Sequence, residues 1–88
     1  MTPTPTQREQ VRLSILRYTQ TQALSENLIR SYLNAEGLPL DAGQVSSEVQ
    51  YLADKGLLTS HEKTISPEVR MWRATAAGRD YLAMQGLE

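Results

Sequence analysis

The sequence of 88 residues contains no cysteine and only one histidine, His61. Without cysteine the chain cannot form disulfide bonds, a thiolate metal site or a cysteine nucleophile. A single histidine cannot form a zinc site unless several carboxylates surround it. We therefore expect no metal site and no cofactor.

Long apolar runs are also missing, and none approaches the roughly 20 residues that a transmembrane helix needs. The first six residues, MTPTPT, lack the basic start and the apolar stretch of a secretory signal. Hydrophobic residues make up 40% and charged residues 22%, which is typical of a soluble globular domain. We expect a cytoplasmic protein with no membrane partner. Its single domain covers residues 7–85, between short tails at 1–6 and 86–88.

The chain also lacks an excess of positive charge, because its formal net charge is −1. Domains that bind nucleic acid usually carry a positive excess. Residues 38–60 hold Lys55 against three acidic residues, a net of −2, whereas residues 61–73 have a net of +1. Any interpretation as a nucleic-acid-binding domain therefore depends on where the charges lie.

Two helices are predicted in the first half of the chain. Thr6 and Glu9 form a capping-box pattern before an apolar stripe at helical spacing, which predicts a helix over residues 7–19. Ser25 is a favourable N-cap for a second helix over residues 26–36, and Gly37 is a typical C-terminal stop. The apolar stripe of this second helix consists of Leu28, Ile29, Tyr32 and Leu33.

A third helix is predicted between Asp41 and Gly56. Asp41 and Gln44 form a second capping-box pattern. Val45, Val49 and Leu52 fall on one face, so we expect them to point into the core. At 100° per residue, the outward face then consists of Gly43, Ser46, Ser47, Gln50 and Asp54, with Gln44 at its border and Glu48 nearer the core edge.

The hydrophobic period changes after Leu58. Residues 57–63 and 69–75 favour extended strands, and Ser66-Pro67 predicts a turn in the loop between them. On the second strand we expect Trp72 and Ala74 to face the core. A short fourth helix follows Thr75. Gly78 within it is less favourable for helix formation than alanine by about 1 kcal/mol. A close approach of another backbone segment would explain the presence of glycine at this position.

This order of elements predicts a winged helix-turn-helix, an α+β fold that is mostly α. The four-residue connection at 37–40 suits a helix-turn-helix corner. A β-hairpin directly after the second helix of such a pair is the winged-helix arrangement, and the hairpin closes the open side of a three-helix core. Tyr18, Tyr32 and Tyr81 are expected in the core with Trp72, whereas Tyr51 points sideways on the third helix and is open to a contact role.

The sequence also resembles a known family. Residues 49–58, VQYLADKGLL, resemble the end of a winged-helix recognition helix running into the first wing strand. Residues 72–79, WRATAAGR, resemble the aromatic-x-Leu-Thr-x-x-Gly-Arg signature that closes many wings, with Ala74 in place of the leucine. More narrowly, residues 24–58 are similar to small winged-helix proteins of Mu-like phages and prophages, of the ArsR-like superfamily. Metal sensors of that group bind through cysteine, so metal sensing does not carry over.

The resemblance implies a DNA-binding transcriptional regulator or DNA-associated factor, with double-stranded DNA as partner. The predicted third helix would enter the major groove, and the wing would touch the flanking backbone. The candidate base-reading residues are Gln44, Ser46, Ser47, Gln50 and Tyr51. The candidate phosphate contacts from the wing and the first helix are Arg8, Arg12, His61, Lys63, Arg70 and Arg73.

Other interpretations remain open. A helix face rich in serine and glutamine is also typical of a solvated surface, and the cations can simply pair with nearby glutamates. The acidic third helix favours an alternative function, a winged-helix adaptor that docks another phage or host protein in packaging or assembly. No acid–base motif or glycine-rich phosphate loop is present, so we do not expect an enzyme. Since no spare terminal helix is predicted, we expect a monomer or a weak homodimer.

Overall fold

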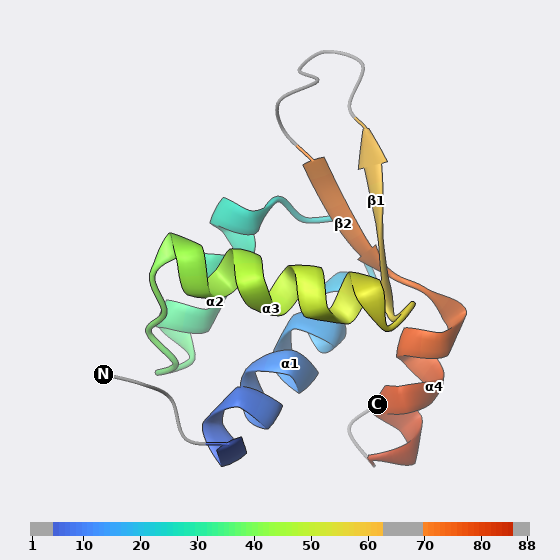
Figure 1. The fold of residues 1–88 in the computed structure, drawn as a ribbon, viewed down its shortest axis with the longest axis horizontal. Helices are drawn as coiled ribbons and strands as arrows, with labels where there is room; N and C mark the ends of the chain where they lie inside the picture. The colour runs from blue at the N-terminus through green and yellow to red at the C-terminus, as the bar shows by residue number, and fades with distance from the viewer. Residues whose placement is uncertain (1–4, 63–69, 86–88) are drawn as a thin grey trace.

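The computed structural model describes residues 5–62 and 70–85. Within these ranges the elements follow the order of a winged helix-turn-helix (Figure 1). Their bounds are α1 Pro5–Thr19, α2 Glu26–Ala35, α3 Ala42–Asp54, β1 Leu58–Glu62, β2 Arg70–Ala74 and α4 Ala76–Met84. Helix α3 lies across α1, and the hairpin of β1 and β2 extends away from α1 and α4. The predicted fold class is confirmed. No helix in these ranges has the length and apolar character needed to cross a membrane.

In the helix-turn-helix, α2 and α3 begin at the predicted N-caps, and α2 stops before the predicted Gly37. Ser25 Oγ accepts the backbone N–H of Leu28 at the start of α2. After α2, Gly37 adopts a φ of +88°, which lets the N–H of Leu38 donate to the carbonyl of Leu33 at 2.8 Å. Helix α3 then begins with a complete capping box between Asp41 and Gln44.

The predicted start of α1 is wrong. The helix begins at Pro5, two residues earlier than expected, so Thr6 lies inside the helix and is not its N-cap. Proline suits the first helical position, because its missing N–H would have no helical partner there. The Glu9 side chain, expected to complete a capping box, accepts the Tyr81 hydroxyl at 2.5 Å and joins α1 to α4.

The hairpin pairs antiparallel, from Leu58 opposite Ala74 to Glu62 opposite Arg70. Its predicted Ser66-Pro67 turn lies outside the described residues. The other edge of β2 is partly covered by the segment before α2. There the N–H of Leu24 donates to the carbonyl of Trp72 at 2.9 Å, and the N–H of Trp72 donates back at 2.8 Å. Nothing in the sequence had predicted this bridge.

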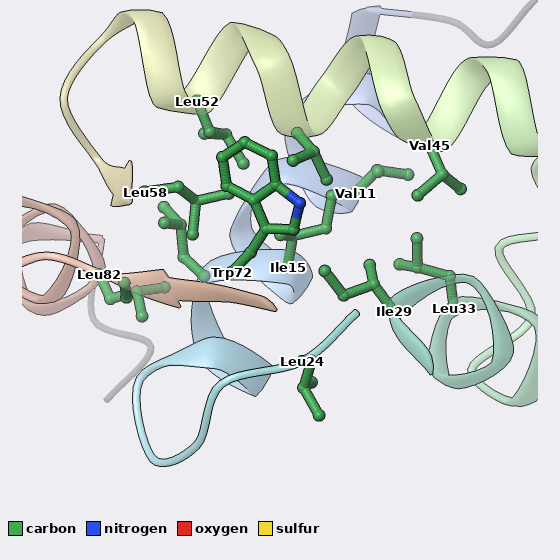
Figure 2. Close-up of a cluster of buried hydrophobic side chains, with 13 residues drawn as sticks. Val11, Ile15, Leu24, Ile29, Leu33, Val45, Leu52, Leu58, Trp72 and Leu82 are labelled. Carbon is green, nitrogen blue, oxygen red and sulfur yellow. The ribbon is translucent and has the colours of Figure 1, made fainter. Parts of the chain in front are cut away.

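One hydrophobic core lies between the helices and the hairpin, with Trp72 at its centre (Figure 2). As predicted, Trp72 and Ala74 are buried, and so are the inward residues of α3, Val45, Val49 and Leu52. Tyr18 and Tyr81 are half-buried and pack against this core.

The prediction that Tyr32 belongs to the core is wrong, because the residue is 37% exposed. Ile29 and Leu33, four residues apart, form the buried face of α2. Tyr32 lies to one side of this face, where its ring meets the Tyr18 ring edge-on with centroids 5.3 Å apart.

Gly78 stands where the start of α4 meets the connection between α3 and β1. A Cβ atom at this position would come within 2.3 Å of the backbone oxygen of Leu57. Thr75 accepts the N–H of Gly78 through its Oγ1, and the same hydroxyl donates to the carbonyl of Gly56 at 2.7 Å. The close approach that would explain a glycine in this helix is therefore present.

Candidate nucleic-acid interface

The outward face of α3 carries most of the predicted base-reading residues. Because Val45, Val49 and Leu52 point inward, the opposite side of the helix is exposed. Four predicted base-reading residues on this side line an open hollow of about 480 Å³ together with Asp54. The four are Ser46, Ser47, Gln50 and Tyr51. The structure thus brings these side chains together on one polar surface.

Gln44 is placed differently from the other predicted base readers. Its side-chain carbonyl oxygen accepts the backbone N–H of Asp41 at 3.0 Å. The Asp41 carboxylate in turn accepts the backbone N–H of Gln44 at 2.8 Å. The amide of Gln44 is therefore turned back toward the start of α3, where its role is to cap the helix.

Glu48 lies at the contact between α1 and α3, where its side chain is only 8% exposed. Arg12 donates from Nε to one carboxylate oxygen at 3.2 Å and from Nη2 to the other at 3.3 Å. Arg8 adds a longer ion pair, with 3.7 Å between Nη2 and Oε1. The charge of Glu48 is therefore balanced inside the α1–α3 contact and adds little to the exposed charge of α3.

Arg12 also holds Tyr51. Its guanidinium carbon lies 3.9 Å from the centroid of the Tyr51 ring, close enough for a cation–π interaction. The Nζ of Lys55 lies 5.6 Å from the same centroid. Arg12 is thus turned toward α3 and shields one part of Tyr51, while the residue as a whole remains 39% exposed.

Three of the remaining predicted phosphate contacts, Arg8, Arg70 and Arg73, are exposed. The Arg8 side chain is 53% exposed and borders a second hollow, of about 470 Å³, together with Gln44 and Ser47. Arg70 and Arg73 are exposed on β2. His61 stands in β1 opposite Met71, but its side chain and the whole of Lys63 fall outside the described residues.

Neither the Gln50–Asp54 bond nor the Arg12–Glu48 pair was predicted, and the two differ in the signal that the sequence offers. Gln50 donates from Nε2 to Asp54 Oδ1 at 3.0 Å; the spacing of four residues is a local signal from which this bond could have been predicted. Arg12 and Glu48 are 36 residues apart, and no local pattern predicts such a pair.

Compared by sequence, the chain matches no family model and no curated protein. Its fold, however, is similar to solved structures. A PadR family transcriptional regulator from Eggerthella lenta has a TM-score of 0.80 and 18% identity, over 92% of this chain and 72% of that one. A putative transcriptional regulator from Thermoplasma acidophilum has a TM-score of 0.80 and 17% identity, over 93% and 80%.

A third similar structure is Bacillus subtilis PadR in complex with operator DNA. Its TM-score is 0.77 and its identity 20%, over 99% of this chain and 49% of that one. At such identities the likeness shows the fold, which is that of a winged helix-turn-helix. The descriptions of the Eggerthella lenta and Thermoplasma acidophilum proteins name transcriptional regulators.

Proposed function

We propose that this chain is a DNA-binding winged-helix transcription regulator whose α3 lies in the major groove of duplex DNA. The observation that carries the proposal is the uncovered polar face of α3 beside the hairpin. Serine, glutamine and tyrosine side chains on such a face suit base edges and phosphates. The structural neighbour from Bacillus subtilis is described in complex with operator DNA, which supports the same use of the fold here.

The acidic composition of α3 no longer opposes this function strongly. Asp41 caps the helix, and Glu48 is buried in its ion pair with Arg12. Asp54 is the remaining acid of this segment, and Lys55 stands beside it in the sequence. The local electrostatic cost of approaching phosphates is therefore smaller than the net charge of residues 38–60 indicates.

In the proposed complex, exposed cations on both sides of α3 contact the DNA backbone. Arg8 lies at the α1 side, and Arg70 and Arg73 belong to the wing. His61 and Lys63 complete the proposed set by their place in the sequence. We assign Arg12 a supporting role, because its guanidinium already binds Glu48 and covers Tyr51.

The finer assignment rests on the resemblance of residues 24–58 to winged-helix proteins of Mu-like phages and prophages. On that basis we propose a transcriptional regulator or DNA-associated factor of phage or prophage type, acting in the cytoplasm. We also propose that the chain is a monomer or a weak homodimer, in which each copy meets one half-site with modest affinity.

Salt dependence of binding to a fluorescent duplex tests the proposal. Each phosphate contact contributes about −0.9 to the slope of log affinity against log salt, so four cationic contacts give about −3 to −4. The substitution Arg73→Gln should reduce the slope by about one. Arg79→Gln, which removes an exposed arginine on α4, is the matched control and should leave it unchanged. A slope near zero for the unsubstituted chain overturns the proposal.

A second candidate function, a winged-helix adaptor for another phage or host protein, is favoured by α2. Leu28 is 44% exposed and Tyr32 is 37% exposed on this helix. Exposed large apolar side chains are typical of protein contacts when they lie together. If the adaptor function holds, the substitution Leu28→Ser should weaken partner binding, and duplex DNA should not compete.

A further inference from the structure

The bond between Gln50 and Asp54 fixes one side chain on the proposed reading surface. Both residues are exposed on α3 and line the same open hollow. Gln50 Nε2 donates to Asp54 Oδ1 at 3.0 Å. Because an ionised carboxylate only accepts hydrogen bonds, the amide of Gln50 must turn its NH₂ group toward Asp54.

This orientation determines what Gln50 can offer a base. An amide group has two N–H donors and one carbonyl acceptor, so one donor and the acceptor remain after the bond to Asp54. A side-chain amide that offers one donor and one acceptor matches the N7 and N6 edge of adenine in the major groove. Gln44 lacks this freedom, since its carbonyl oxygen already accepts the N–H of Asp41.

We propose that Asp54 is a positioning residue that orients Gln50 to read adenine. The proposal rests on the function proposed above, and it gives a role to the one acid on the exposed face of α3. Near the phosphates, the same negative charge weakens binding to every duplex. Asp54 therefore increases base discrimination while it lowers general affinity, and these two effects can be separated.

Two substitutions at the same position separate them. Asp54→Asn removes the charge but keeps a side-chain oxygen that can accept from Gln50, whereas Asp54→Ala removes both. A selection from a pool of randomised duplexes first gives the preferred site of the unsubstituted chain. Gln50→Ala then identifies the base pair that Gln50 reads, because only there should a preference of about 5- to 150-fold disappear.

The decisive measurement is the ratio of the affinities for two duplexes that differ only at this base pair, determined for each variant. We expect both Asp54 variants to bind all duplexes more tightly than the unsubstituted chain. Asp54→Asn should keep the preference for adenine. Asp54→Ala should lower it by about twofold, as expected for the loss of one orienting bond at this spacing. Thermal unfolding should be nearly the same for both variants, since the pair is exposed.

The outcomes that overturn the proposal differ from those that overturn the function. If Asp54→Ala keeps the full preference, or if both variants lose it equally, Asp54 does not position Gln50 although the chain binds DNA. If Gln50→Ala relaxes a base pair other than A·T, the assignment to adenine is wrong. If the unsubstituted chain binds no duplex, the proposed function fails, and this proposal fails with it.

Discussion

Arg12 of α1 binds Glu48 of α3 through two hydrogen bonds of 3.2 and 3.3 Å. The side chains are 17% and 8% exposed, so the ion pair is largely withdrawn from water. Arg12 also packs on Tyr51, one helical turn further along α3. Through this one residue, α1 fixes both the position of α3 and one aromatic side chain on its outward surface.

Arg12→Met should therefore destabilise the fold by about 3 kcal/mol, because it leaves the buried Glu48 carboxylate without its main partner. Arg12→Met together with Glu48→Met should recover most of this loss, since no unpaired charge remains. Denaturant unfolding measures both effects. Arg17→Met, which breaks the more exposed Arg17–Glu36 pair, is the control and should cost at most about 1 kcal/mol. A cost for Arg12→Met no larger than that of the control would contradict a structural role for the pair.

Gly78→Ala should destabilise the protein by about 2 kcal/mol or more, despite the better helix propensity of alanine. The added Cβ would meet the Leu57 carbonyl oxygen at 2.3 Å, and that oxygen belongs to the backbone. Gly43→Ala is the matched control in α3, because its Cβ would only touch Asp41 Oδ1 at 3.4 Å. The control should be neutral or stabilising by up to about 1 kcal/mol. Equal midpoints of thermal unfolding for the two variants would show that the contact at Gly78 is relieved without cost.

The local features of this fold could be predicted from the sequence. The caps Ser25 and Asp41 are satisfied by backbone groups within three residues, and the spacing of Val45, Val49 and Leu52 determines which side of α3 is buried. These patterns depend only on neighbouring residues, so they also predicted most of the outward face of α3.

Features that depend on distant partners could not be predicted in this way. The Thr6–Glu9 pattern failed because Pro5 starts the helix and Tyr81, 72 residues from Glu9, takes its carboxylate. The bridge between Leu24 and Trp72 likewise joins segments that no local pattern relates. At the site, the net charge of residues 38–60 includes Glu48 as an acid of α3. In the structure, the packing of α3 against α1 pairs Glu48 with Arg12.

The Tyr81–Glu9 bond should make stability depend on alkaline pH. The hydrogen bond to Glu9 raises the pKa of Tyr81 above its ordinary value of 10.0, and partial burial adds to this effect. A raised pKa in the folded state means a contribution that is complete below pH 10 and is lost as the pH rises through the folded value. Denaturant unfolding between pH 9 and about 11 should therefore show a steeper loss for the unsubstituted chain than for Tyr81→Phe. Parallel curves would show that this bond does not contribute.

Trp72, the only tryptophan of the chain, should report on the core and not on DNA. Its indole N–H is buried and has no hydrogen-bond partner among the described residues, and its side chain lies among apolar residues (Figure 2). We expect short-wavelength fluorescence that is poorly quenched by acrylamide and shifts to longer wavelength on unfolding. Addition of duplex DNA should leave the emission nearly unchanged. Strong quenching by DNA would indicate that Trp72 stacks on bases and is not a core residue.

The most direct test of the central claim is a backbone NMR titration with duplex DNA at low salt. If α3 lies in the major groove, the amides of Ser46, Ser47 and Gln50 should shift most, followed by those of Arg70 and Arg73 in the wing. The amides of Leu28 and Tyr32 on α2 should move little, and the shifts should fade as salt is added. No shift in α3, or shifts confined to α2, would contradict the proposal that this helix binds DNA.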